Sequence, residues 1–146
     1  MGALDVAERG IELAIQELRN RGASVERTNE GRSRNLLNVV GSIERQTTVY
    51  VKTRRTGTWH STVGRGSLRT KPLDERRFWM FVDLTSDPPK FFVAPESWVE
   101  TNIYETHNAF LERHGGQRPR NPRSTHHGIG TDRITEWQDR WDLLGL

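Results

Sequence analysis

A lysine at the end of an alternating segment is the first candidate for chemistry. Val49 and Val51 alternate with polar residues up to Lys52, and this period of two is typical of a strand whose polar face ends at the lysine. The β-prone run 36–40 precedes it after a glycine-containing turn, which favours a hairpin. Asn38 would then share a face with Lys52. We expect the two side chains to frame one polar site, in a register that the sequence leaves open.

Basic residues gather in two later segments. Eight lie between Lys52 and Arg77 against two acids, and a second group of arginines has no acid between its ends. The two groups include Arg54, Arg55, Arg65 and Arg69 in the first, and Arg113, Arg118, Arg120 and Arg123 in the second. The planar guanidinium suits phosphate oxygens. The pattern therefore favours a polyanionic partner such as nucleic acid, with solvated loop charge as the alternative.

Aromatic and imidazole side chains accompany these arginines. Trp59 lies in the first group, where an indole can stack on a nucleobase or equally anchor its loop to the core. Imidazole can accept and donate a proton at physiological pH, so His60, His126 and His127 could each serve as a base. A His-His pair before glycine is also typical of a loop that contacts phosphate. We expect all four side chains to contact nucleic acid.

Composition limits the possible classes of protein. The 146 residues are 33% hydrophobic and 28% charged, with five Trp and five Phe, which is enough for one modest core. The absence of cysteine excludes disulfides and thiolate chemistry. No apolar run approaches the roughly 18 residues that a membrane span needs, and no secretion-signal pattern begins the chain. We therefore expect a single soluble, cytoplasmic domain without membrane contact.

Hydrophobic periodicity and turn residues predict the elements that position these side chains. We expect a helix over 3–20, strands over 23–27, 36–40, 47–54, 78–84 and 91–94, and a helix from Ser97 to His114 begun by a capping box with Glu100. The segments 55–77 and 117–130 are expected to be irregular. A last helix is expected from residue 131, because Ile134, Trp137, Trp141 and Leu144 recur at helical spacing.

This order of elements resembles the PD-(D/E)xK, or restriction endonuclease-like, nuclease superfamily. The run Val-Tyr-Val-Lys-Thr at 49–53 looks like the family's Gln-Val-Lys-Thr half-motif, and Arg54 and Trp59 follow it. The resemblance implies one α/β domain over 1–146. It also implies a central mixed sheet of about five strands, flanked by an N-terminal helix and two C-terminal helices.

The same resemblance implies a catalytic centre. In that family an acid on one strand and a Glu-x-Lys or Gln-x-Lys on its neighbour hold a divalent cation at the scissile phosphate. These positions match Asn38, Tyr50 and Lys52, with a glutamate from the first helix at Glu12. The match departs from the family pattern, because an amide and a phenol replace the acidic ligands that Mg²⁺ prefers.

Three glutamates are candidate replacement ligands, namely Glu12, Glu26 and Glu44. Mg²⁺ is expected only if the chain is catalytically active. The leading hypothesis is therefore a protein of nuclease-like fold that binds nucleic acid, with DNA as the expected partner and a degenerate catalytic centre. An active metal-dependent DNA endonuclease is the second hypothesis. A module that presents arginines to an acidic protein is the third, and a homodimer is left open.

Overall fold

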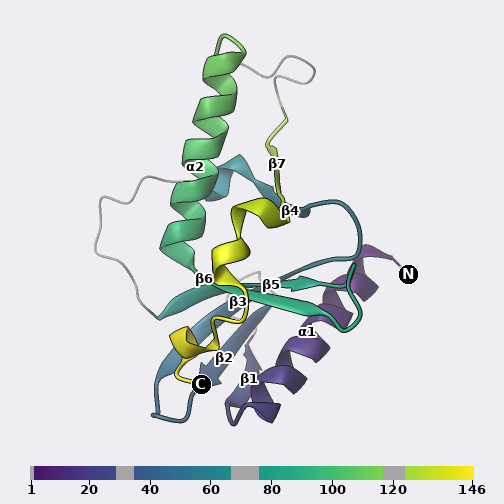
Figure 1. The fold of residues 1–146 in the computed structure, drawn as a ribbon, viewed down its shortest axis with the longest axis vertical. Coiled ribbons are helices and arrows are strands. Elements are labelled where there is room, and N and C mark those ends of the chain that lie inside the picture. Colours follow the sequence, from purple (N-terminus) through teal and green to yellow (C-terminus); the bar gives the residue numbers. More distant parts are fainter. Residues whose placement is uncertain (1, 29–34, 67–75, 117–123) are drawn as a thin grey trace.

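A mixed sheet of five strands forms the centre of the chain (Figure 1). The computed structural model describes residues 2–28, 35–66, 76–116 and 124–146. The strand order is β1-β2-β3-β5-β6, where β3 and β5 run parallel and the other neighbours antiparallel. The strands are β1 (Ser24–Thr28), β2 (Leu36–Val40), β3 (Gln46–Arg54), β5 (Arg77–Asp83) and β6 (Lys90–Pro95).

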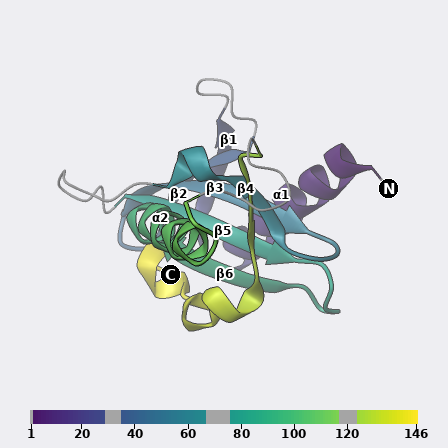
Figure 2. The same ribbon diagram turned by 90° about the horizontal axis from the view of Figure 1, so that it is seen from above.

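Helices cover the two faces of this sheet. Helix α1 (Ala3–Asn20) packs on one face, and α2 (Glu96–Arg113) lies over the other together with a two-stranded sheet of β4 (Trp59–Thr62) and β7 (His126–Ile129). Figure 2 looks nearly along α2 and shows the arrangement from above. No helix in the described residues is long and apolar enough to cross a bilayer.

Most of the predicted elements are present. The helix over 3–20 and the strand over 36–40 have the predicted bounds. The ends of β1, β5 and β6 differ from the predicted ends by one residue. Helix α2 begins at Glu96 rather than Ser97, and its N-cap residue, Pro95, makes no side-chain cap. The predicted capping box is therefore wrong. The Glu96 carboxylate instead accepts a hydrogen bond from Arg77 Nε at 2.8 Å.

Two further predictions, one about the irregular segments and one about the C-terminal helix, are also wrong. Strands β4 and β7 lie within segments that we expected to be irregular, and each is short and finds its partner far away in sequence. The expected C-terminal helix is instead a series of 3-10 turns, η2 (Thr131–Arg133), η3 (Thr135–Trp137) and η4 (Trp141–Leu144). Asp139, whose φ is +55°, interrupts the helical course. Its amide instead donates a hydrogen bond to Phe91 O at 3.0 Å.

The alternation of β3 gives the sheet two different faces. Val49 and Val51 are at most 1% exposed and belong to the core beneath α1. Tyr50 points to the opposite face, where it packs against the second core beside α2. Because side chains alternate along a strand, Lys52 and Arg54 share the face of Tyr50.

Helix α1 approaches β3 closely at a glycine. A Cβ placed on Gly10 would overlap Thr53 Oγ1 and would lie 2.6 Å from Thr53 Cβ and 2.7 Å from its Cγ2. Real Cβ atoms do not come this close to another side chain, and Gly10 is buried. The absence of a side chain at this position therefore sets the distance between helix and sheet.

The substitution Gly10→Ala should destabilise the fold. Alanine favours a helix by about 1 kcal/mol over glycine, but overpacking at this contact should cost about 1–3 kcal/mol and outweigh that gain. Urea unfolding would measure the difference. Glu12→Ala, at an exposed position two residues away, serves as control and should change the midpoint little. A Gly10→Ala variant as stable as the wild type would contradict the close contact.

Candidate functional site

Two cations lie over the rings of Tyr50 and Trp79 on the α2 side of the sheet. We call these two rings the aromatic floor. Tyr50 of β3 and Trp79 of β5 are paired across the parallel strands, and the centroids of their rings are 5.1 Å apart. Lys52 Nζ lies 5.7 Å from the centre of the Tyr50 ring, and the Arg65 guanidinium carbon lies 5.1 Å from it. Arg65 also lies 5.8 Å from the centre of Trp79. We call Lys52 and Arg65 the cationic pair.

Neighbouring side chains and turns hold the aromatic floor and the cationic pair in place. Trp79 is 1% exposed, and its indole Nε1 donates to Glu96 Oε1 at 3.4 Å. The other Glu96 oxygen accepts from Arg77. Arg65 belongs to the short turn η1 (Val63–Arg65), and the following Gly66 packs against α2, where a Cβ would lie 2.9 Å from Tyr104 N. The geometry of the pair is thus fixed by β3, β5, η1 and α2.

The cationic pair concentrates positive charge where water is partly excluded. Neither Lys52 nor Arg65 forms an ion pair with a carboxylate among the described residues, and Glu96 is engaged with Arg77. Burial lowers the pKa of Lys52 below its ordinary value, and the charge of Arg65 lowers it further. Aromatic rings attract both cations through their faces. An anion that bridged the pair would compensate the desolvation of Lys52 and offset the repulsion between the two cations.

Asn38 lies on the predicted face but away from Lys52. It is paired with Thr48, four residues before Lys52, which corresponds to about 13 Å along the strand. The two side chains therefore do not frame one site, and this expectation is wrong. Asn38 instead lines a separate groove of about 460 Å³ with Thr48, Arg76 and Arg77.

The three glutamates that could replace metal ligands are also placed apart from Lys52. Glu12 is exposed on α1, on the other side of the sheet, and its Oε2 lies 3.7 Å from Arg9 Nη1. Glu26 of β1 is paired with Asn38 of β2. Glu44 lies in the turn before β3, at the end of that strand away from Lys52. Nowhere in the described part of the chain do three carboxylate or imidazole groups gather as a metal site. These residues do not fit the Mg²⁺ centre that the resemblance implies.

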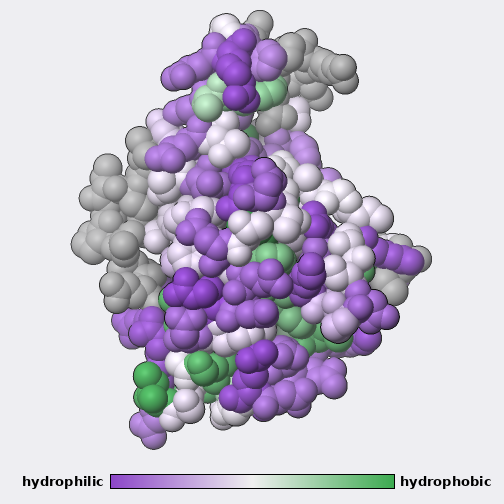
Figure 3. Space-filling view, in the orientation of Figure 1, coloured by the Kyte–Doolittle hydropathy of each residue, from purple (hydrophilic) through white to green (hydrophobic). Residues whose placement is uncertain are grey.

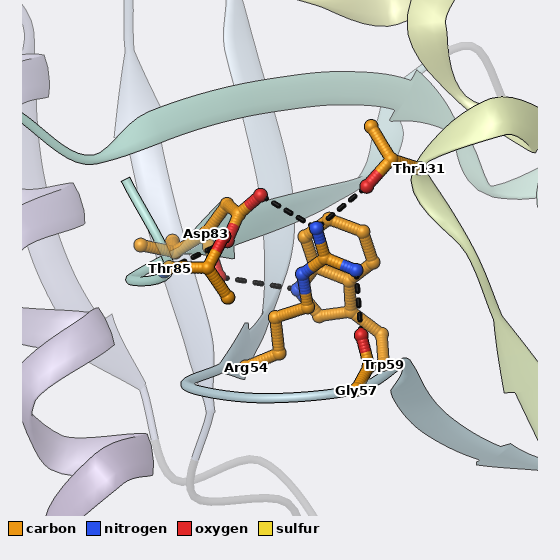
Figure 4. Close-up of polar contacts among 7 residues, drawn as sticks. Arg54, Gly57, Trp59, Asp83, Thr85 and Thr131 are labelled. Atoms are coloured by element: carbon orange, nitrogen blue, oxygen red, sulfur yellow. Dashed lines mark hydrogen bonds and ion pairs between the residues drawn. The ribbon is translucent and has the colours of Figure 1, made fainter. Parts of the chain in front are cut away.

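Arg54 has a structural role rather than the predicted contact with nucleic acid (Figure 4). Its side chain is 12% exposed, and its Nη2 donates to Asp83 Oδ2 at 2.7 Å and to Thr131 Oγ1 at 2.6 Å. Its Nη1 donates to Gly57 O at 2.7 Å. The guanidinium also stacks on Trp59, 4.0 Å from the ring centre. Arg54 therefore joins β3, β5, β4 and η2.

Trp59 anchors its segment to the core, which was the alternative to base stacking. It is completely buried, packs edge-on against Phe81 and Phe92, and donates from Nε1 to Val82 O at 3.1 Å. Its predicted contact with nucleic acid is wrong because no solvent reaches the ring. Arg55 and His60, before and within β4, are exposed and remain candidates.

The adjacent histidines of β7 have different surroundings. His126 is exposed, and its ring lies 4.8 Å from that of His60 across the ladder of β4 and β7. His127 is 7% exposed, and its Nε2 lies 3.0 Å from Arg133 Nη1. The predicted contacts of Arg69, Arg118, Arg120 and Arg123 lie outside the described residues.

Three contributors to the site were missed by the sequence analysis. Trp79 was assigned to a central strand, Arg77 to the irregular segment before it and to the first basic group, and Glu96 was left outside the predicted helix. A weak signal existed, because an arginine directly precedes the most apolar run of the chain. No local pattern indicated that Tyr50 and Trp79 would be neighbours, because the parallel pairing of β3 and β5 brings them together.

No protein-family model, curated protein or solved structure matches this chain.

The ion pair of Arg54 and Asp83 should contribute strongly to stability. Asp83→Asn would leave the Arg54 charge buried without its carboxylate, so we expect a loss of about 3–5 kcal/mol at pH 7 in urea unfolding. Asp142→Asn removes a carboxylate from the exposed pair with Arg140 and is the matched control, because a surface pair contributes little. Equal midpoints for the two variants would contradict the structural role of Arg54.

The same pair should make stability depend on pH. Burial alone would raise the pKa of Asp83, but hydrogen bonds from Arg54 and Thr85, with the charge of Arg54, hold it below its ordinary value. A lowered folded-state pKa adds stability above the unfolded value of about 3.9, and this is lost as pH falls through the folded value. The stability difference between wild type and Asp83→Asn should therefore narrow in acid. A difference that stayed constant from pH 7 to pH 2 would oppose this account.

Proposed function

We propose that this chain binds the phosphate backbone of nucleic acid, with DNA as the first expected partner, through the cationic pair. The observation that carries the proposal is that Lys52 and Arg65 stand over one aromatic floor with no carboxylate partner among the described residues. Such a pair can contact neighbouring phosphate oxygens, and the guanidinium of Arg65 can do so with two donors.

Surrounding charge supports a polyanion as the partner. Arg55 and His60 are exposed on the segment that connects β3 to η1, close in sequence to both members of the pair. The chain carries a formal net charge of +3. The face of the molecule seen in Figure 3 is mostly hydrophilic, and Ile43 is the exposed large hydrophobic side chain of the described part. These features favour an electrostatic contact over an apolar docking surface.

The order of elements supports a restriction endonuclease-like fold as part of the same proposal. A first helix precedes three antiparallel strands, and the third of these runs parallel to the next strand of the sheet. Lys52 stands near the end of that third strand, as the lysine does in the resembling family. The predicted ligands around it lie apart, so the proposed activity is binding without metal-dependent cleavage.

One series of binding and cleavage assays tests the proposal. Labelled duplex, single-stranded and branched DNA, and RNA, are incubated with wild type, Lys52→Ala and Arg65→Ala in Mg²⁺, Mn²⁺ or EDTA. We expect binding in EDTA, and about tenfold weaker binding for each variant, since each would lose a charge-assisted hydrogen bond. Each variant should also lower the slope of log affinity against log salt by about 0.9, the value of one phosphate contact in duplex DNA.

Lys90→Ala and Arg9→Ala are the matched controls. Both remove an exposed cation away from the pair, so their affinities should stay close to that of the wild type. Equal losses in all four variants would mean that only net charge matters and would overturn the site. Metal-dependent cleavage abolished by Lys52→Ala would replace the proposal with an active nuclease. No binding to any nucleic acid would leave an acidic protein as the partner to test.

A further inference from the structure

A second basic groove lies between α2 and β7. Its volume is about 270 Å³. The lining combines the last turns of α2, the strand β7 and the turn η2, and consists of Thr106, His107, Phe110, Arg113, His126, His127, Gly128 and Arg133. Every ionisable side chain that the structure describes in this lining is basic. Such a groove favours an anionic group, because none of its described residues is a carboxylate that would offset the charge.

Arg133 places a fixed charge in the lining of this groove. Its Nε donates to Asn102 Oδ1 at 2.9 Å, and its Nη1 donates to Gly128 O at 3.1 Å. These acceptors are neutral, and no carboxylate lies within ion-pair distance of Arg133 among the described residues. Burial lowers the pKa of Arg133, and the charge of Asp132 opposes that effect. The guanidinium nevertheless stays protonated, so its charge is oriented without being neutralised by direct contact.

The imidazole of His127 is oriented by this arginine. Arg133 Nη1 lies 3.0 Å from His127 Nε2, and arginine can only donate, so the imidazole nitrogen accepts. His127 thus has its proton on Nδ1. Hydrogen bonds to Asn102 of α2 and Gly128 of β7 hold the side chain of Arg133 in place. The groove is therefore built by contacts between elements that are distant in sequence.

We propose that this groove binds a phosphate monoester, the terminal phosphate of a nucleotide or of a nucleic-acid strand. Within the lining, Arg113 and His107 supply charged or polar donors, Thr106 supplies a hydroxyl, and Phe110 supplies an apolar surface. The volume lies just below the range of pockets that enclose whole drug-sized ligands, and it suits a phosphate with part of its sugar.

The proposal goes beyond the function proposed above and stands on different residues. The two sites are nevertheless neighbours in the fold, because Thr62 of β4 is paired with His126, and η1 with Arg65 follows directly. Val63 N also donates to Thr125 O at 2.8 Å, which ties η1 to the segment before β7. A nucleic-acid strand could therefore contact the cationic pair through its backbone and this groove through its terminal phosphate.

Amide chemical shifts in NMR titrations test the proposal. Wild type is titrated with inorganic phosphate, with adenosine monophosphate, and with a short single-stranded oligonucleotide that carries either a 5′-phosphate or a 5′-hydroxyl. We expect shifts at His107, Gly128 and Arg133, and tighter binding of the phosphorylated oligonucleotide. Arg113→Gln should weaken phosphate binding about tenfold, the value of a lost charge-assisted hydrogen bond.

Arg9→Gln is the matched control, because it makes the same change on the opposite side of the sheet and should leave phosphate affinity unchanged. Lys52→Ala should also retain it, which separates this groove from the cationic pair. Shifts with inorganic phosphate but no preference for the 5′-phosphate would keep the anion site and assign it to free phosphate. The proposal is overturned if no phosphate compound shifts these amides, or if Arg9→Gln weakens binding as much as Arg113→Gln.

Discussion

The buried ion pair between Arg54 and Asp83 is the contact on which much of the fold depends. It joins the ends of the two parallel strands, and the same guanidinium reaches Gly57, Thr131 and the face of Trp59. Breaking a buried pair is far more costly than breaking an exposed one, because the remaining charge stays out of water. The end of β3 can therefore present Lys52 in one fixed position.

A second constraint is the alternation of side chains along β3. One face must pack under α1, and there Gly10 lets the helix come close to Thr53. The other face then carries Tyr50 and Lys52. Any carboxylate of α1 is separated from Lys52 by the thickness of the sheet, and this excludes Glu12 from a shared site. The cations remain on the face that α2 and η1 only partly cover.

Local patterns predicted the local elements well. The bounds of α1 and β2 follow from periodicity, and Lys52 was found because an alternating strand has to place it on the polar face. The assignment of Asn38 failed because register is a property of the pair of strands rather than of either run. In the observed register Asn38 stands opposite Thr48. Arg54 and Trp59 were misjudged for a similar reason, since burial depends on segments that come much later.

The aromatic floor shows most clearly what a linear pattern omits. Tyr50 and Trp79 meet because β3 and β5 are parallel, and a parallel pair requires a crossover that no local signal marks. The charge of Arg65 was recognised, but its position over these rings depends on the contact of Gly66 with α2. Residue types were thus predictable, whereas their grouping was not.

The short ladder of β4 and β7 has a consequence for the order of assembly. Trp59 is paired with Ile129, seventy positions later in the chain, and both belong to the same core as Phe81 and Phe92. Contacts of such long sequence separation slow folding, because the intervening chain must be ordered before they form. During synthesis Trp59 has no strand partner until β7 has left the ribosome. The second core therefore cannot be complete before β7 and Ile134, which follows it, are available.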